Sequence, residues 1–328
     1  MKYFLGIDIG GTKCGVVLGN TKGDLGSAKL EIVHKFRFLT DLEKGPNYNI
    51  NRICESIEEM LIRYKVKMEE VESIGISCGG PLDSRKGIIL SPPNLPGWDN
   101  IYIVEIIEKR FKVKTRLQND ANACALAEWK FGAGRGFKNL VFLTFGTGMG
   151  AGLILDGKLY SGTSDMAGEI GHIRMEQSGP IGYGKVGSFE GFCSGGGIAQ
   201  LAKMKVMERL LAGEKVSFCD GIHKIEEINA KIVSDAAKNG DELAKEIYEI
   251  SGYYLGCGIS ILIDILNPEV IIVGSIFVRS RELLWDKALQ VIEKESLERS
   301  KGVCKVVSAE LGENIGDYAA LAVACNEY

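Results

Sequence analysis

Two glycine-rich stretches carry groups that suit a phosphate. The first, Asp8-Ile-Gly-Gly-Thr-Lys13, ends a short apolar run. Glycine lets backbone N–H groups approach a phosphate closely, Thr12 can donate a hydrogen bond to it, and Asp8 can hold Mg²⁺ or its waters. A hairpin turn that simply needs glycine explains this string equally well.

The second stretch, Thr144-Phe-Gly-Thr-Gly-Met-Gly150, offers the same groups in the second half of the chain. Two such loops are harder to explain by turns than one, so we expect them to hold the phosphates of one nucleotide in a cleft. Their spacing differs from the G-x-x-x-x-G-K-[ST] pattern, and neither has the G-x-G-x-x-G context of a dinucleotide-binding fold. Both of those fold types are therefore disfavoured.

Between the two loops lies Gln118-Asn-Asp-Ala-Asn122, at the predicted end of a strand and start of a helix. Asn and Asp are favoured as helix N-caps, which is one interpretation of Asn119 and Asp120. The other is that Asp120 accepts the proton of a sugar hydroxyl as the hydroxyl attacks phosphorus, while Asn119 orients a neighbouring hydroxyl. The two roles are compatible.

Two further carboxylates and an imidazole follow in a stretch without periodicity. Glu169 and His172 stand in Gly168-Glu-Ile-Gly-His172, and Glu190 comes after Phe189. Carboxylates and neutral imidazole fix the direction of a hydroxyl's hydrogen bond, so they suit a polyol. A surface loop with solvated charges is the alternative interpretation for each of them.

Apolar periodicity predicts the elements that position these residues. The first half contains predicted strands at 3–10 and 14–18 forming a hairpin, a turn at 19–20, an extended stretch at 28–39, strands at 72–80 and 113–117, and helices near 50–64, 101–111 and 121–131. The second half contains predicted strands at 140–145, 151–155, 269–273 and 304–308, a Gly-rich region at 161–197, and helices at 198–211, 225–238, 241–266, 282–295 and 315–325. Each half opens with a hairpin around a glycine turn, which favours two α/β lobes.

Composition narrows the class of protein. The chain has 328 residues, 45% hydrophobic and 25% charged, which is ample for two lobes. Its net charge of −4 and the lack of a basic stripe argue against a nucleic-acid partner. The N-terminal residues lead directly into the first loop without a signal or membrane segment, so we expect a cytoplasmic protein with no membrane partner. The nine cysteines include no C-x-x-C pair and are expected to be reduced and mostly buried.

Taken together, the motifs resemble the ROK family of repressors, uncharacterised reading frames and sugar kinases, and the resemblance covers nearly the whole chain. The matching strings are D-I-G-G-T-K from Asp8, G-G-P-L-D from Gly79, N-L-P-G-W from Asn94, N-D-A-N from Asn119, F-G-T-G-M-G-A-G from Phe145, G-E-I-G-H from Gly168, E-G-F-C-S-G from Glu190, V-G-S from Val273 and G-E-N-I-G-D-Y-A-A from Gly312. The resemblance implies an α/β, two-lobe ribonuclease H-like fold of the actin, hexokinase and Hsp70 superfamily. A small lobe would comprise residues 1–118 and about 309–328, and a large lobe residues 119–308.

The resemblance also implies site roles. The ATP phosphates would be surrounded by Gly10, Gly11, Thr12, Lys13, Gly146, Thr147 and Gly148, and the adenosine would lie near Gly274 and Ser275. The sugar would contact Asn119, Asp120, Glu169, His172 and Glu190, with Gly80 and Asn94 at its rim. Asp120 would be the catalytic base for the 6-hydroxyl, and Asp8 would lie near Mg²⁺, directly or through water. Homodimerisation is implied in the same way.

One segment departs from the family pattern. Family members usually hold a structural zinc with the histidine of G-H and three cysteines, whereas here Gly182, Gly184 and Ser188 stand where the cysteines belong. We therefore predict no zinc site. Because zinc would normally fix the imidazole, His172 needs another partner, for which Tyr183 or a backbone carbonyl is the candidate.

The predicted activity is ATP-dependent phosphorylation of a hexose at its 6-hydroxyl, with glucose favoured. The alternative substrate is N-acetylmannosamine or another N-acetylhexosamine. The alternative of a different class is a non-catalytic sugar-sensing regulator. Since family repressors carry a DNA-binding helix-turn-helix before the first strand, and the phosphate motif begins at residue 8, we expect the kinase.

Overall fold

The computed structural model describes residues 2–21 and 30–326. The chain divides into two compact units: the first contains residues 1–137, 152–167 and 310–328, and the second contains residues 138–151 and 168–309. The lobe boundaries given above remain a prediction. In the compact units, residues 119–137 and 152–167 lie with the first unit rather than the second.

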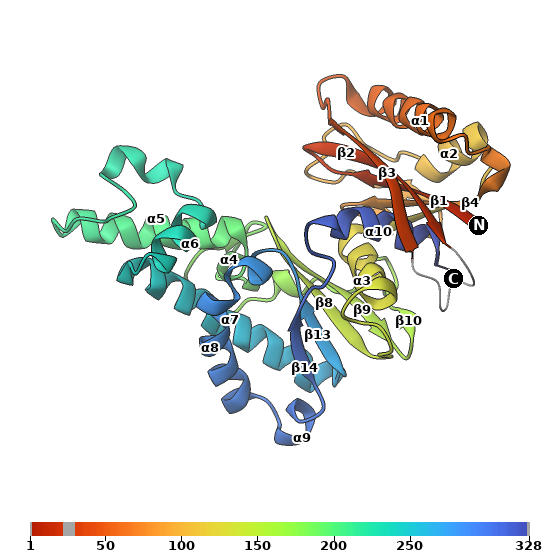
Figure 1. Cartoon of the computed structure of the whole chain (residues 1–328). Coiled ribbons are helices and arrows are strands. Elements are labelled where there is room, and N and C mark those ends of the chain that lie inside the picture. The colour runs from red at the N-terminus through yellow and green to blue at the C-terminus, as the bar shows by residue number, and fades with distance from the viewer. Residues whose placement is uncertain (1, 22–29, 327–328) are drawn as a thin grey trace. The chain divides into compact units, whose positions relative to one another are not determined.

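A five-stranded sheet forms the centre of the first unit (Figure 1). Its order is β3 (Leu30–Leu39), β2 (Lys13–Thr21), β1 (Lys2–Ile9), β4 (Val71–Cys78) and β7 (Thr115–Asn119), with β1, β4 and β7 parallel to one another. The predicted hairpin is confirmed as β1 and β2. The turn predicted at Gly19-Asn20 is wrong, because these residues continue β2 and pair with Phe4 and Tyr3 of β1. Of the extended stretch at 28–39, residues 28–29 lie outside the described residues.

Helices cover both faces of this sheet (Figure 1). On one face, α1 (Gly45–Tyr64) and α2 (Ile103–Phe111) bury side chains of alternate strand residues such as Leu5, Ile7 and Ile9. On the other, α10 (Ile315–Ala324) packs against Phe4 and Val17, and α3 (Asp120–Phe131) lies beside α10. The remaining elements of this unit are η1 (Met68–Glu70), η4 (Gly312–Asn314), β5 (Leu82–Asp83), β6 (Ile88–Ile89) and β10 (Lys158–Leu159).

Glycine permits the close approach of α10 to the sheet. Gly6 and Gly75 are neighbours in the register of β1 and β4. A Cβ on Gly75 would overlap the carbonyl oxygen of Ala320, and a Cβ on Gly6 would lie 2.8 Å from the Ala320 Cβ. The helix backbone therefore rests directly on the strands, at a distance that no larger residue at these positions allows.

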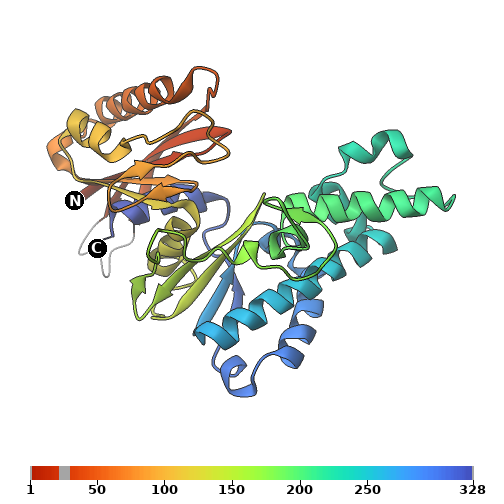
Figure 2. The same cartoon turned by 180° about the vertical axis from the view of Figure 1, so that it is seen from behind.

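The second unit is built on the parallel strands β8 (Leu140–Phe145), β13 (Val270–Val273) and β14 (Lys305–Ser308). They belong to a sheet of order β10-β9-β8-β13-β14, in which β9 (Met149–Leu155) is where the chain passes from the second unit to the first. Two long helices, α7 (Glu242–Leu266) and α8 (Ile276–Glu295), lie side by side against these strands (Figure 2). By length and composition, α7 alone among the described helices would suffice for a membrane span, although Gly252 and Gly256 pack it on α8.

The remaining helices of this unit are α4 (Phe189–Phe192), α5 (Gly195–Leu211), α6 (Ala230–Lys238), α9 (Glu298–Lys301), η2 (Ile170–His172) and η3 (Ile222–Glu227). The single helix predicted at 225–238 is wrong. Asn229 accepts hydrogen bonds from Lys231 N and Ile232 N at 3.1 Å and so starts α6 as an N-cap, separating it from η3. The nine cysteines are free and six are buried, as predicted.

Candidate active site

The carboxyl ends of β1, β4 and β7 bring most of the predicted residues of the first unit together. Asp8 lies at the end of β1, Gly80 follows β4, and Asn119 ends β7. Since parallel strands end at the same edge of a sheet, these residues share one edge. The arrangement is what a binding site at the edge of an α/β sheet requires.

The Gly10–Lys13 loop is held in place on both sides. Gly10 N donates to the Lys13 carbonyl at 3.1 Å, and Thr40 Oγ1 donates to the Gly10 carbonyl at 2.6 Å. A Cβ on Gly11 would overlap the carbonyl oxygen of Asn94. The predicted phosphate loop and the predicted rim residue Asn94 are therefore in contact, and only glycine fits between them.

The other rim and sugar residues of this unit adjoin the same point. A Cβ on Gly79 would lie 3.5 Å from Asn94 Nδ2, and a Cβ on Gly80 would lie 3.2 Å from Asn119 Nδ2. Exposed Asn94 and the half-buried Gly80 and Asn119 thus form one surface. The structure brings these predicted residues of the first unit together.

The N-terminus of α3 separates the two interpretations of Asn119 and Asp120. Asn119 is the N-cap, and its Oδ1 accepts from Ala121 N at 3.0 Å. Asp120 is the first helical residue; it accepts from the same amide at 2.8 Å and is exposed. Because Asn119 already caps the helix, Asp120 presents a carboxylate that the helix does not require.

Negative charge accumulates around Asp8. Burial, together with the nearby Asp120 and Asp317 carboxylates, raises the pKa of Asp8 to about 7, although Arg37 and Lys13 oppose the shift. Although the Asp120 side chain reaches solvent, the protein atoms packed around it displace part of its hydration and raise its pKa, and the Ala121 N–H opposes this shift. Carboxylates that resist ionising together favour a bound cation. Mg²⁺ needs only one or two protein carboxylates besides phosphate and water oxygens, so Asp8 fits this role.

Asp317 and Arg37 are residues of this site that the sequence did not reveal. Arg37 Nη2 donates to the Asp317 carboxylate at 2.9 and 3.0 Å, and Lys35 Nζ donates at 3.1 Å. A Cβ on Gly316 would lie 3.4 Å from Asp8 Oδ2, which places the start of α10 beside Asp8. Lys35 and Arg37 occupy alternate positions of β3 and so share a face, the one signal that could have been followed.

In the second unit, Glu190 supports the 146–148 loop. Its Oε2 accepts from Met149 N at 2.9 Å, and a Cβ on Gly148 would lie 2.7 Å from the same oxygen. Thr144 Oγ1 accepts from Gly150 N at 2.8 Å and closes the loop. Glu190, expected at the sugar, therefore also contacts the backbone next to the predicted phosphate residues Gly146, Thr147 and Gly148.

The start of α5 joins the same loop. Gly195 N donates to the Gly146 carbonyl at 2.8 Å, and Ser194 caps the helix by accepting from Gly197 N at 2.9 Å. A Cβ on Gly146 would lie 3.6 Å from Ser275 Oγ, while Gly274 N donates to Leu143 O at 2.9 Å. The predicted phosphate and adenosine segments thus meet within this unit. The Ser-Gly-Gly-Gly string at a helix start was the signal for the missed α5 terminus.

Glu169 and His172 lie around η2. Gly168 O accepts from Ala151 N at 2.8 Å, and a Cβ on Gly171 would overlap the Met149 carbonyl oxygen, so this turn lies against β9. The His172 ring contacts the Tyr183 ring edge-on, with centroids 6.1 Å apart, and Lys185 Nζ donates to the His172 carbonyl at 2.7 Å. Tyr183 is therefore a neighbour of His172, and the two side chains meet through their rings.

Tyr183 stands in a hairpin formed where the family's cysteines would lie. The hairpin consists of β11 (Ile181–Gly182) and β12 (Lys185–Val186), with Tyr183 and Gly184 at positive φ in its turn. Gln200 donates to Ile181 O at 2.8 Å and accepts from Ile181 N at 3.0 Å. Among the described residues, no group of three or more His, Cys, Asp or Glu side chains is arranged to hold a metal ion.

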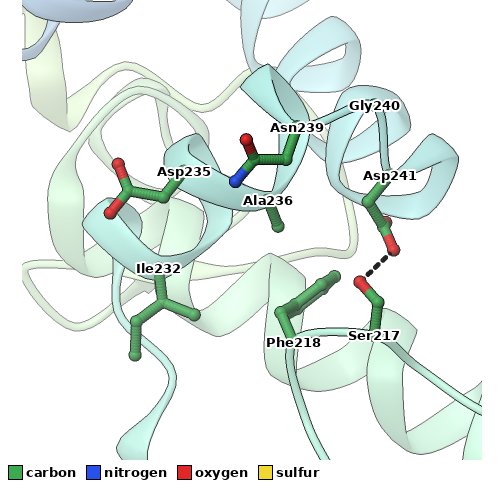
Figure 3. A pocket seen from close by; sticks show the side chains of 8 residues that line it. All are labelled: Ser217, Phe218, Ile232, Asp235, Ala236, Asn239, Gly240 and Asp241. Carbon is green, nitrogen blue, oxygen red and sulfur yellow. Dashed lines mark hydrogen bonds between the residues drawn. The ribbon is translucent and has the colours of Figure 1, made fainter.

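A hollow elsewhere in the second unit contains none of the predicted residues (Figure 3). It measures about 620 Å³, and its walls come from the loop before η3 and from the end of α6. Ser217 Oγ donates to Asp241 at 2.6 Å, and Asp241 also caps α7 through Ala244 N. Two of the polar side chains that line it, Ser217 and Asp241, thus bond to each other.

Comparison with known proteins gives the family. The sequence pattern of the ROK family matches residues 4–327. The chain is 32% identical over 324 residues to a glucokinase of Thermotoga maritima, covering 97% of this chain and 96% of that protein.

Two solved structures give the fold. One is a ROK family glucokinase from Streptomyces griseus in complex with glucose and AMPPNP, with a TM-score of 0.75, 27% identity, and 98% and 99% of the two chains covered. The other is a ROK family transcriptional regulator, a homologue of the E. coli MLC protein, with a TM-score of 0.82, 27% identity, and 98% and 77% covered. The predicted two-lobe fold class of the actin, hexokinase and Hsp70 superfamily is confirmed. Since the family pattern spans nearly the whole sequence, this chain belongs to the ROK family.

Proposed function

We propose that this protein transfers the γ-phosphoryl group of ATP to the 6-hydroxyl of a hexose, with glucose as the favoured substrate and Asp120 as the general base. One observation carries the proposal: the exposed Asp120 carboxylate, which shares the Ala121 amide with the N-cap Asn119, stands at the sheet edge that also holds the Gly10–Lys13 loop. Relatives named glucokinase over almost the full length support the reaction class.

In this mechanism the chain mainly positions and neutralises charge. The sugar oxygen attacks the γ-phosphorus, its proton passes to Asp120, and the bond from phosphorus to the bridging oxygen breaks to release ADP. We expect backbone N–H groups of residues 11–13, 147 and 148 to contact the phosphates, since Gly10 N and Gly146 N each donate within their own loop at 3.1 Å. Gly274 and Ser275 would lie near the adenosine. Mg²⁺ neutralises phosphate charge when bound, and Asp8 would hold it or its waters.

Polar side chains and a rim that includes glycine are proposed to hold the sugar. Asn119 directs a hydroxyl next to the attacking one, and Gly80 and Asn94 form the rim. Glu169, His172 and Glu190 accept or donate hydrogen bonds to the remaining hydroxyls. The Tyr183 ring limits rotation of the His172 imidazole, a contact that supports this role without zinc. Action on N-acetylmannosamine or another N-acetylhexosamine is the alternative substrate assignment.

A second candidate function is sugar sensing without catalysis. The solved ROK regulator has a TM-score of 0.82 to this chain, and the match covers 77% of that protein. A regulator would bind the sugar through the same side chains but would not turn over ATP. For the kinase, we further propose a cytoplasmic homodimer that has no nucleic-acid or membrane partner.

The decisive experiment incubates the protein with ATP, Mg²⁺ and a panel of hexoses and amino sugars while ADP release is followed. Sugar-dependent ADP release with glucose ahead of the amino sugars is the expected result. Calorimetric titration with each sugar runs in parallel. Sugar binding without ADP release on any sugar would replace the kinase with the sensor, and fastest turnover of an N-acetylhexosamine would change the substrate.

A further inference from the structure

A second cavity lies in the first unit, outside the residues assigned to the active site. It measures about 580 Å³. Its walls come from three segments, Ser84–Gly87, Lys114–Gln118 and Leu159–Gly162, together with Val104 and Asp165. A volume of this size suits a small metabolite.

The cavity is lined by more positive than negative charge. Its cations are Arg85, Lys86, Lys114 and Arg116, and its one lining acid is Asp165. Asp165 is occupied by Ser84, which donates from its backbone N at 2.7 Å and from its hydroxyl at 2.8 Å. The four cations of the lining are therefore not balanced by its single carboxylate, which is already hydrogen-bonded to Ser84.

Two of the four cations have other bonds. Lys86 pairs with Asp83 at 3.2 Å, and Arg116 Nη1 donates to the Ala324 carbonyl at 2.9 Å. Arg85 and Lys114 are exposed and have no ion-pair partner in the part of the chain that the structure describes. These two side chains can therefore turn toward a bound anion without breaking an existing ion pair.

Uncharged donors line the same space. The hydroxyls of Ser161 and Tyr160 belong to the lining, and β7 is the last strand of its sheet. Thr115 N and Asn119 N donate to side chains, Glu108 and Gln118 respectively, rather than to a further strand. Because strand amides alternate, Leu117 N–H faces the same free edge. A phosphate here would meet both cations and neutral donors.

The cavity wall also supports the turn that carries Asp120. Gln118 lines the cavity, and its Oε1 accepts from Asn119 N at 2.9 Å and from Asn122 Nδ2 at 3.1 Å. Asn122 Nδ2 also lies 3.5 Å from Ser161 Oγ. The buried Asn122 Oδ1 has no hydrogen-bond partner among the described residues. A ligand that moves Gln118 or Ser161 therefore acts on the residues next to Asp120.

We propose that this cavity binds the phosphate group of a small phosphorylated metabolite and that binding alters the turn at Asn119 and Asp120. Arg85 and Lys114 supply the charge, and Ser161, Tyr160 and the free edge of β7 supply further donors. The half-buried Val104 offers apolar surface to the rest of the molecule. Phosphate binding in the cavity does not depend on the activity proposed above, because none of the residues that line the cavity has a role in that reaction, whereas the effect on Asn119 and Asp120 rests on the proposed function.

The test measures hydrogen–deuterium exchange of the full chain with and without inorganic phosphate, and separately with glucose 6-phosphate. Slower exchange in peptides covering 84–87, 114–118 and 159–165 is expected. These peptides do not include the loops at 10–13 and 146–148, so protection of the cavity and protection of the loops are measured separately. Protection by both probes assigns the phosphate group itself, and protection by glucose 6-phosphate alone assigns the sugar phosphate. Protection confined to the two loops overturns the proposal.

Charge variants make the test quantitative. Arg85→Glu and Lys114→Glu should each raise the calorimetric Kd of the bound probe by at least about tenfold, the loss of a charge-assisted hydrogen bond. Lys109→Glu is the matched control, since Lys109 is exposed on α2 outside the cavity. Equal weakening in all three variants would show only general charge attraction and would overturn the site. Arg85→Ala repeats the test if a charge reversal prevents folding.

Discussion

Glu128 is a fully buried carboxylate whose removal should destabilise the first unit. Its Oε2 accepts from Ala133 N at 2.8 Å and from Glu310 N at 3.2 Å, and its Oε1 accepts from Leu311 N at 3.0 Å. It thereby fastens the end of α3, the helix that begins with Asp120, to the segment that leads into α10. Three backbone amides thus depend on one buried side chain.

Two substitutions separate charge from hydrogen bonding. Glu128→Ala leaves three amides without an acceptor, at about 1–3 kcal/mol each, and partial relaxation toward water should limit the loss to about 3–5 kcal/mol. Glu128→Gln keeps one oxygen for two of the amides but turns an NH₂ group toward the third. We expect it to cost about 1.5–3 kcal/mol, the value of one charge-assisted hydrogen bond.

The free energy of unfolding would be obtained from urea titrations followed by far-UV circular dichroism. Hydrogen exchange of peptides near 130–134 and 309–312 would locate the change. Glu105→Gln is the matched control: this residue is exposed on α2, and its variant should stay within about 0.5 kcal/mol of the wild type. If both Glu128 variants are as stable as the control, the reasoning from the buried Glu128 carboxylate and its three amide partners is refuted.

Three further predictions concern the site and its support. Asp120→Asn should lower kcat by about 10²–10⁴ with the sugar Kd unchanged, because only proton transfer is lost; near-normal turnover in ADP-release assays would leave Asp120 without the role of base. Gly75→Ala should cost at least about 2 kcal/mol in urea titrations, because its Cβ would overlap the Ala320 carbonyl of α10, and a neutral result would show that α10 can move away. Asp8, with a pKa of about 7 against 3.8 ordinarily, is protonated in both states at low pH, and above pH 4 its ionisation increasingly favours the unfolded chain. Without Mg²⁺, Asp8→Asn should therefore stabilise the protein at pH 8 by up to about 4 kcal/mol and leave it unchanged near pH 3; equal effects at both pH values would contradict the shifted pKa.

Local sequence patterns predicted most of the helices and strands. They failed at two places where strand pairing or helix capping sets the end of an element. Most strands and helices were found, although α1 and α8 begin at Gly45 and Ile276, before their predicted starts at 50 and 282. Gly19 and Asn20 look like a turn, yet their hydrogen bonds to β1 keep them in β2. Asn229 interrupts an apolar period that would otherwise continue from η3 into α6. Periodicity reports which face is buried, whereas these two outcomes depend on individual hydrogen bonds.

The sequence by itself was enough to single out the two loops predicted to bind phosphate and the Asn119-Asp120 pair, because each is a short string with a recognisable combination of glycine, hydroxyl, amide or carboxylate groups. It also revealed the missing cysteines at Gly182, Gly184 and Ser188. The sequence left open which residue caps α3. The structure shows that it is Asn119, because its side chain accepts hydrogen bonds from the amides of Ala121 and Asn122.

Only the tertiary structure showed the pair of Arg37 with Asp317, which lie 280 positions apart, and the cavity at the edge of β7. The reason that the Arg37–Asp317 pair could not be predicted is that α10, which carries Asp317, reaches β1 and β4 through backbone contact at Gly6 and Gly75. Glycine there leaves no side-chain pattern from which a partner could be inferred. A contact such as that of Gly6 and Gly75 with α10, which depends on the absence of a side chain, can be recognised only in the folded structure.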